Sequence, residues 1–368
     1  MSAAVRAMSG EPDLDLGIAP DRLLPAREPA EIRGAGRDDV RLLLQERDSG
    51  ILRHQSFRDL AEILRPGDLL VVNRSATLPA SLPARDGRGV ALRIHVARRQ
   101  GPGCYRVEAR SADGLSPAEH VPAPGAQIFL ERGHGERLAL EVLRRASPDS
   151  RQIVVAVEGA RSLGPWLAEI GAPIRYGYVT RAWPLEFYQT VFAGPPGSAE
   201  MPSAARPFTL SILASLRRRG VRVAGLVLHC GLSSEEVTGR LADHFLPPEP
   251  FWLPQATVRA ILETRAGGGR VVAVGTTVVR ALMSASPEGR LVPRRGLAGA
   301  VARPGADVHL IDGMLTGLHT PRSSHLAMLE AFAPPGHLRD AYEAAIERGY
   351  LWHEFGDMHL ILPGVRRA

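Results

Sequence analysis

The sequence contains no lysine, so all 45 of its basic residues are arginine. This absence excludes Schiff-base chemistry on a lysine side chain. Ala, Gly and Pro are also abundant, which indicates that coding bias accounts for much of the arginine excess. The net charge is nevertheless +6 and the isoelectric point about 9.9. Because arginine binds phosphate and carboxylate groups through a rigid fork, a polyanionic partner such as a nucleic acid stays open.

Cysteine is scarce as well, with only Cys104 and Cys230 in 368 residues. Their wide separation argues against a disulfide framework and a zinc cluster, and we expect no metal. It also favours a reducing compartment, which predicts a cytoplasmic protein. Apolar runs stay well below the roughly 20 residues that span a bilayer, and residues 1–16 lack a signal-peptide pattern. We expect a monomer without a membrane partner.

The chain is long enough for two domains, and 45% of its residues are hydrophobic. From about residue 200 onward, strand and helix patterns alternate, which indicates an α/β domain with a mainly parallel sheet and flanking helices. Between residues 76 and 159, short alternating segments separated by Gly and Pro predict an inserted small β-barrel. Residues 1–20 are then a disordered lead, 76–159 the barrel domain, and 21–75 with 160–368 the α/β domain.

Local patterns predict the individual elements. The expected strands cover residues 37–47, 51–54, 69–72, 90–96, 104–109, 127–130, 138–143, 153–157, 221–228, 271–274, 308–312 and 357–362. The expected helices cover residues 57–64, 163–170, 209–219, 254–267, 325–332 and 338–348, with a further helix after residue 275.

The most informative stretch runs from Val271 to Arg280. Its apolar, β-branched beginning predicts a buried strand that ends at Gly275. Thr276 or Thr277 can cap the helix that follows. Free backbone N–H groups at a helix N-terminus suit a carboxylate, a phosphate or a ribose hydroxyl, and Arg280 would lie about one turn further along. The alternative is an ordinary strand-to-helix turn with Arg280 in solvent.

Ligands of open α/β sheets bind beyond the carboxyl ends of the strands. This rule gathers four predicted loops, at residues 73–75, 229–234, 275–277 and 316–324. The candidate ligand-binding residues are Asn73, Gly231, Gly275, Thr276, Thr277, Arg280, Pro321 and Ser323. The candidate catalytic residues are His229, His319 and Asp312, because imidazole and carboxylate groups can act as general bases. Each histidine can also be a polar residue without function at the end of a strand or in a loop.

Three neighbouring residues are not assigned to the site. Cys230 follows His229 directly, but adjacent residues of a strand point to opposite faces, which argues against a nucleophile–base pair. His353 and His359 have no visible partner in the sequence, and we expect them to be structural or exposed.

Six segments occur in an order that points to one family. They are RPGDLLVVN (65–73), YQTVFA (188–193), LHCGL (228–232), GGRVVAVGTTVVRAL (268–282), IDGMLTGLHTPRSSHLAML (311–329) and FGDMHLI (355–361). In these segments the chain resembles the S-adenosylmethionine:tRNA ribosyltransferase-isomerases of queuosine biosynthesis. The resemblance covers nearly the whole chain and implies an α/β domain with an inserted β-barrel domain.

The resemblance also implies a reaction. The ribosyl part of S-adenosylmethionine, the co-substrate, moves onto the aminomethyl group of a modified deazaguanine in a tRNA anticodon. It is rearranged to an epoxycyclopentane, while adenine and methionine leave, and no metal is needed. The sulfonium acidifies the adjacent ribose carbon, so a positioned base can begin the elimination. Carboxylates, carbonyls and aromatic faces would suit the cationic donor.

Several of the same loops depart from the family pattern. The family's Asn-Asp-Thr-Arg and Pro-Ala-Arg become Asn-Arg-Ser-Ala at residues 73–76 and Pro-Ala-Ser at 79–81. Its Pro-Thr-Ala-Gly-Leu-His-Phe-Thr becomes residues 202–209, which lack the histidine. After His229, Gly-Thr-Phe becomes Ser-Ser-Glu, and His-x-x-His-x-Glu becomes residues 244–249 without the second histidine. The Asn before the family's Phe-His is a glycine here.

Three functions are therefore weighed. The first is the family enzyme acting on tRNA. The second is a diverged paralogue that uses S-adenosylmethionine with a small-molecule acceptor or a different bond cleavage. The third is a non-catalytic binder of a nucleoside or RNA. The retained Gly-Thr-Thr turn, Arg280, His229 and His319 favour an enzyme, whereas the lost acid, arginines and histidine favour the second function over the first.

Overall fold

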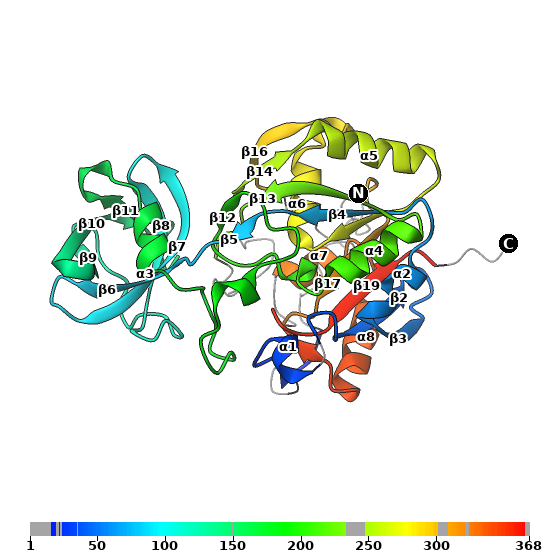
Figure 1. Ribbon diagram of the computed structural model, residues 1–368, viewed down its shortest axis with the longest axis horizontal. Coiled ribbons are helices and arrows are strands. Elements are labelled where there is room, and N and C mark those ends of the chain that lie inside the picture. The colour runs from blue at the N-terminus through cyan, green and yellow to red at the C-terminus, as the bar shows by residue number, and fades with distance from the viewer. Residues whose placement is uncertain are drawn as a thin grey trace, which may run out of the picture.

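The structure is a computed structural model that describes residues 16–19, 22, 24–34, 36–148, 150–232, 247–300, 308–320 and 324–364. A closed β-barrel lies beside a larger α/β unit, which is built on a sheet of nine strands in these residues (Figure 1). The predicted fold class, an α/β domain with an inserted β-barrel, is confirmed.

The sheet of the α/β unit is mixed rather than mainly parallel. Its strand order is β16-β14-β13-β4-β15-β17-β19-β2-β3. The four central strands, which are mutually parallel, are β13 (Arg222–Leu228), β4 (Leu69–Asn73), β15 (Val271–Val274) and β17 (Gly313–Gly317). The outer strands, which add antiparallel pairs, are β16 (Arg294–Ala298), β14 (Glu249–Leu253), β19 (Met358–Leu362), β2 (Arg41–Glu46) and β3 (Leu52–Ser56).

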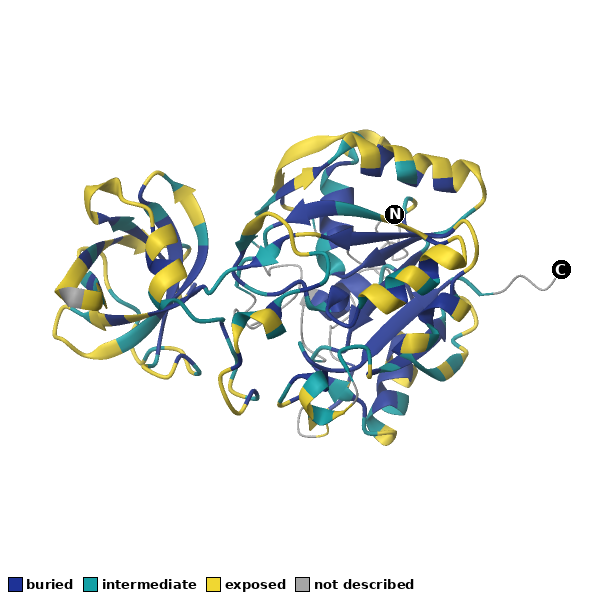
Figure 2. Cartoon of the chain, in the orientation of Figure 1, coloured by how far each residue is buried: buried dark blue, intermediate teal, exposed yellow. Residues whose placement is uncertain are grey.

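Helices cover both faces of this sheet and produce two cores. One face packs against α2 (Leu60–Ile63) and α4 (Leu210–Arg218), the other against α5 (Gln255–Ala266), α6 (Thr276–Ser284), α7 (Ser324–Leu329) and α8 (Pro335–Glu347). Successive strand residues face opposite sides, so Leu69 and Val71 join one core and Leu70 and Val72 the other. The strands are accordingly buried and the outer helix faces exposed (Figure 2).

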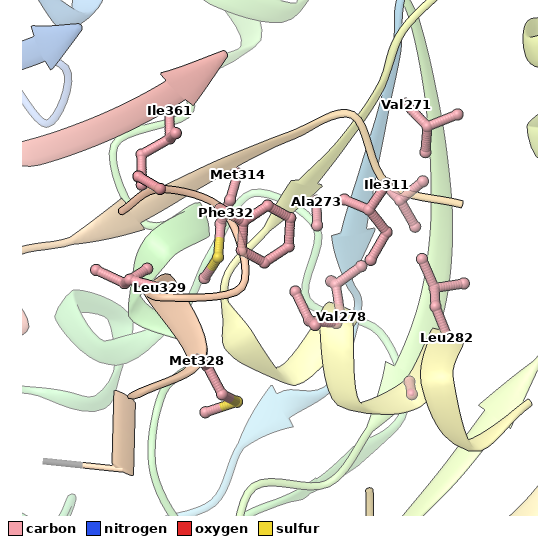
Figure 3. Close-up of a cluster of buried hydrophobic side chains, with 14 of the residues drawn as sticks. Val271, Ala273, Val278, Leu282, Ile311, Met314, Met328, Leu329, Phe332 and Ile361 are labelled. Carbon is pink, nitrogen blue, oxygen red and sulfur yellow. The ribbon is translucent and has the colours of Figure 1, made fainter. Parts of the chain in front are cut away.

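Figure 3 shows the first core beside the central strands, where side chains of β15, β17, α6 and α7 meet. Val271 and Ala273 of β15 face Val278 of α6, and Met314 of β17 lies near Phe332. This packing fixes α6 directly after β15, as the pattern of residues 271–280 predicted. A short helix α1 (Ala30–Arg33) and the parallel pair β1 (Leu24–Pro25) and β18 (Leu351–Trp352) complete the unit. Among the residues described above, no helix is long and apolar enough to cross a membrane.

The barrel has its own core. Its strands are β6 (Ser81–Asp86), β7 (Ala91–Gly101), β8 (Cys104–Arg110), β9 (Gln127–Arg132), β10 (Glu136–Arg145) and β11 (Gln152–Val157), closed in the order β10-β11-β8-β7-β6-β9. Helix α3 (Gly164–Ile170) adds Trp166 and Leu167 to this core. All six strands lie inside the interval 76–159, whose limits as a domain stay a prediction.

Two short paired strands form a neck between the barrel and the α/β unit. β5 (Ala76–Thr77) leads from β4 into the barrel, and β12 (Pro196–Ser198) lies on the return path toward β13. The two strands are parallel and hydrogen-bonded. Gln189 reinforces the neck, since its side chain binds both the N–H and the C=O of Thr77 at 3.0 and 2.8 Å.

Several expected elements differ. The strand predicted at 308–312 is wrong, because the strand β17 begins at Gly313 and runs to Gly317. β6, β14 and β16 were not predicted. Pro83 has no backbone N–H to donate, which argues against a strand at β6 from sequence. In the short strands β14 and β16, a proline and two arginines obscure the alternation of apolar and polar residues.

Candidate active site

The carboxyl ends of the four parallel strands meet at one edge of the sheet, hereafter the carboxyl edge. Asn73 ends β4, while His229, Gly275 and Leu318 directly follow β13, β15 and β17. β19 runs in the opposite direction, so the residues that precede it reach the same edge. The described parts of the four loops gathered by the strand pattern therefore lie together.

The turn after β15 adopts the predicted strand–glycine–helix form. Gly275 has a φ of +88°, which favours glycine, and a Cβ there would lie 3.2 Å from the Ala204 Cβ. Gly275 itself precedes the first helical residue, Thr276, and no side chain caps the helix, so the expected threonine cap is wrong. Both threonines are half-buried at the edge.

Asn73 connects the ends of three elements. Its Oδ1 accepts hydrogen bonds from the N–H groups of Leu228 and Ser75, both at 3.0 Å. Its Nδ2 donates to the Leu228 carbonyl at 2.8 Å and to Thr277 Oγ1 at 3.3 Å. Both ends of this buried amide are occupied, so Asn73 positions Ser75 and Thr277 rather than offering its own atoms to a ligand.

His229 is held by a chain of hydroxyl groups. Its Nδ1 lies 2.7 Å from Ser75 Oγ, and Ser198 Oγ donates to Ser75 Oγ at 2.7 Å. Ser198 Oγ in turn accepts the N–H of Cys230 at 2.9 Å. Burial lowers the pKa of His229, which keeps the imidazole neutral at neutral pH. Cys230 is itself buried and its pKa is raised by that burial, so the thiol is unreactive.

Arg280 is buried instead of lying in solvent. Its guanidinium forms an ion pair with Glu249 and donates to the carbonyl groups of Pro247 and Ala298, both at 3.2 Å. Glu249 also accepts the N–H of Gly231 at 2.6 Å. Arg280 and Gly231 are thus joined through one carboxylate, which leaves neither the guanidinium nor the Gly231 N–H open to a ligand.

Asp312 lies at the opposite edge of the sheet. It precedes β17, its Oδ2 accepts the N–H of Val271 at 2.8 Å, and Arg265 lies 3.5 Å away. Asp312 was predicted as a catalytic residue because the expected strand 308–312 would have ended there, at the carboxyl edge. Since that strand is wrong, the prediction for Asp312 is wrong as well. Asp312 begins the β15–β17 ladder. Pro321 and Ser323 lie outside the described residues.

His319 belongs to a group of rings that the strand pattern does not reveal. Its ring stacks on His325 with centroids 3.8 Å apart and meets His353 edge-on at 6.3 Å. His353 in turn stacks on Tyr178 at 4.4 Å. Burial, with His353 nearby, lowers the pKa of His319 to about 3, and burial lowers that of His353 to about 4. These imidazoles are neutral at neutral pH and present flat faces.

Two carboxylates complete the site and were missed from sequence. Tyr176 donates a hydrogen bond to Glu200, and the Tyr178 hydroxyl is bonded to Glu354. Burial and the neighbouring Glu200 raise the pKa of Glu354 to about 8. The position of Glu354 in the chain could have revealed it. Glu354 precedes β19, which runs antiparallel to β17, so it must lie at the carboxyl edge. His353, expected to be structural or exposed, lies beside it.

The edge therefore combines a neutral, oriented imidazole, a helix N-terminus, stacked rings and buried carboxylates. Such a set can bind a cationic organic substrate and remove a proton from it. Within the described residues, no three His, Cys, Asp or Glu side chains are arranged to hold a metal ion.

Comparisons with known proteins agree with this architecture. Residues 20–361 match the protein family described as Queuosine biosynthesis protein. The S-adenosylmethionine:tRNA ribosyltransferase-isomerases of Pelobacter propionicus and Thermus thermophilus are each 36% identical to this chain, over 93% of its length and 98% of theirs. The crystal structure of the S-adenosylmethionine tRNA ribosyltransferase of Thermotoga maritima is similar with a TM-score of 0.51 at 28% identity, covering 95% of this chain and 99% of that one.

The fold and the edge define an α/β enzyme with an inserted β-barrel, whose site is assembled from strand ends. The chain belongs to the family of queuosine biosynthesis proteins, and its match to that family runs through nearly all of its length.

Proposed function

We propose that this chain is an S-adenosylmethionine:tRNA ribosyltransferase-isomerase. It transfers and isomerises the ribosyl part of S-adenosylmethionine onto 7-aminomethyl-7-deazaguanine in tRNA. The observation that carries the proposal is the full-length similarity, at 36% identity, to proteins of that name. The excess of arginine, with a net charge of +6, is compatible with a tRNA partner.

The proposed general base is His229. The reaction needs a group that removes a proton from the ribose carbon beside the sulfonium. The contact between Nδ1 of His229 and Ser75 Oγ fixes the ring orientation, and Nε2 is the basic nitrogen in the tautomer in which Nδ1–H donates to Ser75. Burial lowers the pKa of the ring, so the basic form is present at neutral pH. Ser75 and Ser198 position the base.

The proposed donor site includes the turn after β15. The backbone N–H groups of Thr276 and Thr277 open helix α6 and suit a ribose hydroxyl or a carboxylate of the donor. Asn73 holds Thr277 at this point by the 3.3 Å hydrogen bond. His319, stacked on His325, offers a neutral ring beside the same edge. Thr277→Val removes the hydroxyl by which Asn73 holds this turn, so it is expected to weaken donor binding about tenfold, as the loss of one hydrogen bond would.

The proposal is tested by incubating the protein with S-adenosylmethionine, with and without tRNA that carries the deazaguanine. Release of adenine and methionine only in the presence of that tRNA is the expected result. Turnover without tRNA, or only with a small amine acceptor, would refute tRNA as the acceptor. Binding without any turnover would refute the enzyme itself.

His229→Ala is expected to lower the rate of adenine release at least 100-fold, in line with the usual contribution of a general base. His120→Ala is the matched control, because that side chain is 87% exposed in the barrel. Equal rates for His229→Ala and the control would remove His229 from the mechanism. The cytoplasmic location and the monomeric state stay predictions from the sequence.

A further inference from the structure

The two carboxylates missed from sequence occupy a defined place in the fold. Glu200 follows the neck strand β12, and Glu354 lies in the turn between β18 and β19. Tyr176 and Tyr178 come from the segment after α3. Their rings lie within 15° of parallel with centroids 6.0 Å apart, and each hydroxyl serves one of the two carboxylates. Three separate segments therefore converge on this acidic cluster.

One oxygen of this cluster is without a partner. Glu354 Oε2 is buried and makes no hydrogen bond, although the residue as a whole is only partly buried. Glu354 lines a pocket at the carboxyl edge together with Arg206, Gly317 and His353. A buried carboxyl oxygen without a hydrogen-bond partner is costly, and a ligand that donates to it would remove that cost.

Arg206 does not supply that donor, because it is committed to another acid. Its guanidinium makes bonds of 2.8 and 3.0 Å to Glu31 and donates to the Phe187 carbonyl at 3.0 Å. Within the described residues, Glu354 makes no ion pair. The pocket thus holds an acid whose cationic partner is not provided by this part of the chain.

The rings beside the acid suit a cation. His353 stacks on one face of Tyr178, with centroids 4.4 Å apart and planes within 14°. Aromatic faces attract ammonium and sulfonium groups through the ring quadrupole. A protonated His353 would oppose a cation, but burial lowers its pKa to about 4, so this ring is neutral at neutral pH.

We propose that Glu354, supported by Glu200 and the rings of Tyr178 and His353, forms a subsite for a positively charged group of the substrate. The group is a primary ammonium, which would donate the missing hydrogen bond to Glu354 Oε2, or a sulfonium, which would pair with the carboxylate through charge alone. The inference rests on the proposed function, in which the donor carries a sulfonium and the acceptor an aminomethyl group.

A proton should leave when the subsite is filled. The groups that face Glu354 are Glu200, which raises its pKa, Arg206, which lowers it, and the hydroxyls of Tyr178 and Tyr188. With a pKa of about 8, Glu354 is largely protonated at pH 7 in the empty protein. A bound cation favours the carboxylate, so its arrival releases the proton to solvent.

The test is calorimetric titration of the full chain at pH 7 in two buffers of different ionisation enthalpy. The ligands are S-adenosylmethionine alone and free 7-aminomethyl-7-deazaguanine alone, which distinguishes the two sources of positive charge. The ligand that occupies the subsite is expected to release a substantial fraction of one proton. Glu354→Gln should weaken that ligand at least tenfold and abolish the release, while the exposed control Glu119→Gln should change neither.

Glu200→Gln provides a second variant. It removes the like charge, which lowers the pKa of Glu354 although burial still raises it, so the proton release shrinks even if affinity is kept. Unchanged affinity and proton release in folded Glu354→Gln, with folding verified by thermal unfolding, would overturn the subsite. So would the absence of binding by either ligand to the unaltered protein.

The two proposals fail separately. If the unaltered protein releases adenine and methionine with tRNA while Glu354→Gln binds both ligands normally, the subsite is refuted and the proposed function stands. If binding depends on Glu354 but no turnover occurs with any acceptor, the proposed function is refuted and the subsite stands.

Discussion

At the scale of single residues, Glu354 makes the stability of the protein depend on pH. Its pKa in the folded chain is about 8, above the ordinary value of 4.5, so the folded state binds more protons between these values. The free energy of unfolding therefore falls as pH rises from about 5 to about 8. Each unit of pKa difference corresponds to about 1.4 kcal/mol. In Glu354→Gln the free energy of unfolding should not show this fall. Urea unfolding of both proteins at about pH 5 and about pH 8 measures the difference. Parallel curves for the two proteins would contradict the prediction.

Gly275 is the residue on which the turn after β15 depends. Its φ of +88° strains any L side chain, and Ala204 crowds the Cβ position. Gly275→Ala is expected to lower the free energy of unfolding by about 1–3 kcal/mol. Gly67→Ala offers a control with a φ of +88° but open space around the Cβ. Chemical denaturation of both variants separates backbone strain from the contact with Ala204. If Gly275→Ala lowers the free energy of unfolding no more than Gly67→Ala does, backbone strain alone explains the loss and the contact with Ala204 contributes nothing.

At the scale of elements, the ion pair between Arg280 and Glu249 joins helix α6 to strand β14, and Glu249 also holds the N–H of Gly231. Arg280→Met leaves a buried carboxylate without its cation and should cost about 3–5 kcal/mol. Arg280→Met combined with Glu249→Gln removes both charges and keeps an oxygen for the N–H of Gly231. The double variant should therefore be more stable than the single one. A double-mutant cycle by urea unfolding measures the coupling, and additive losses would show that the pair is not coupled.

Elements with a strong local pattern were predictable, whereas elements set by long-range pairing were not. β15 and α6 followed from an apolar run, a glycine and a helical repeat. β17 was placed five residues too early, because residues 308–312 are as apolar as the true strand and only the ladder with β15 and β19 decides the register. That error moved Asp312 to the wrong edge of the sheet.

The site was partly predictable for the same reason. His229 and Thr277 follow strands and could be placed at the carboxyl edge from sequence. Arg280 was expected near a ligand, yet its partner Glu249 belongs to a strand that the sequence did not indicate. Glu200 and Glu354 meet only through two tyrosines of another segment, and no spacing along the chain encodes that contact.

At the scale of the whole molecule, the barrel has a core that is separate from those of the sheet. Trp166 of α3 is buried in it, and Arg132 stacks on the Trp166 ring at 4.5 Å. A fragment of residues 76–171 should therefore fold alone and unfold cooperatively. Trp166 is the single tryptophan in that fragment, so its emission reports the core directly. Emission typical of an exposed indole, without a cooperative transition, would show that the barrel needs the sheet.

The neck carries a mechanical consequence for the base. The β5–β12 ladder joins the entry of the chain into the barrel to its return path, and Ser75 and Ser198 lie beside and within it, respectively, linked by a hydrogen bond. These two hydroxyls are also what orients His229. Because these contacts are hydrogen bonds within one short ladder, a displacement of the neck is expected to shift Ser75 and Ser198, and with them the His229 ring. We therefore expect that a large substrate docked on the barrel would alter the orientation of the His229 ring.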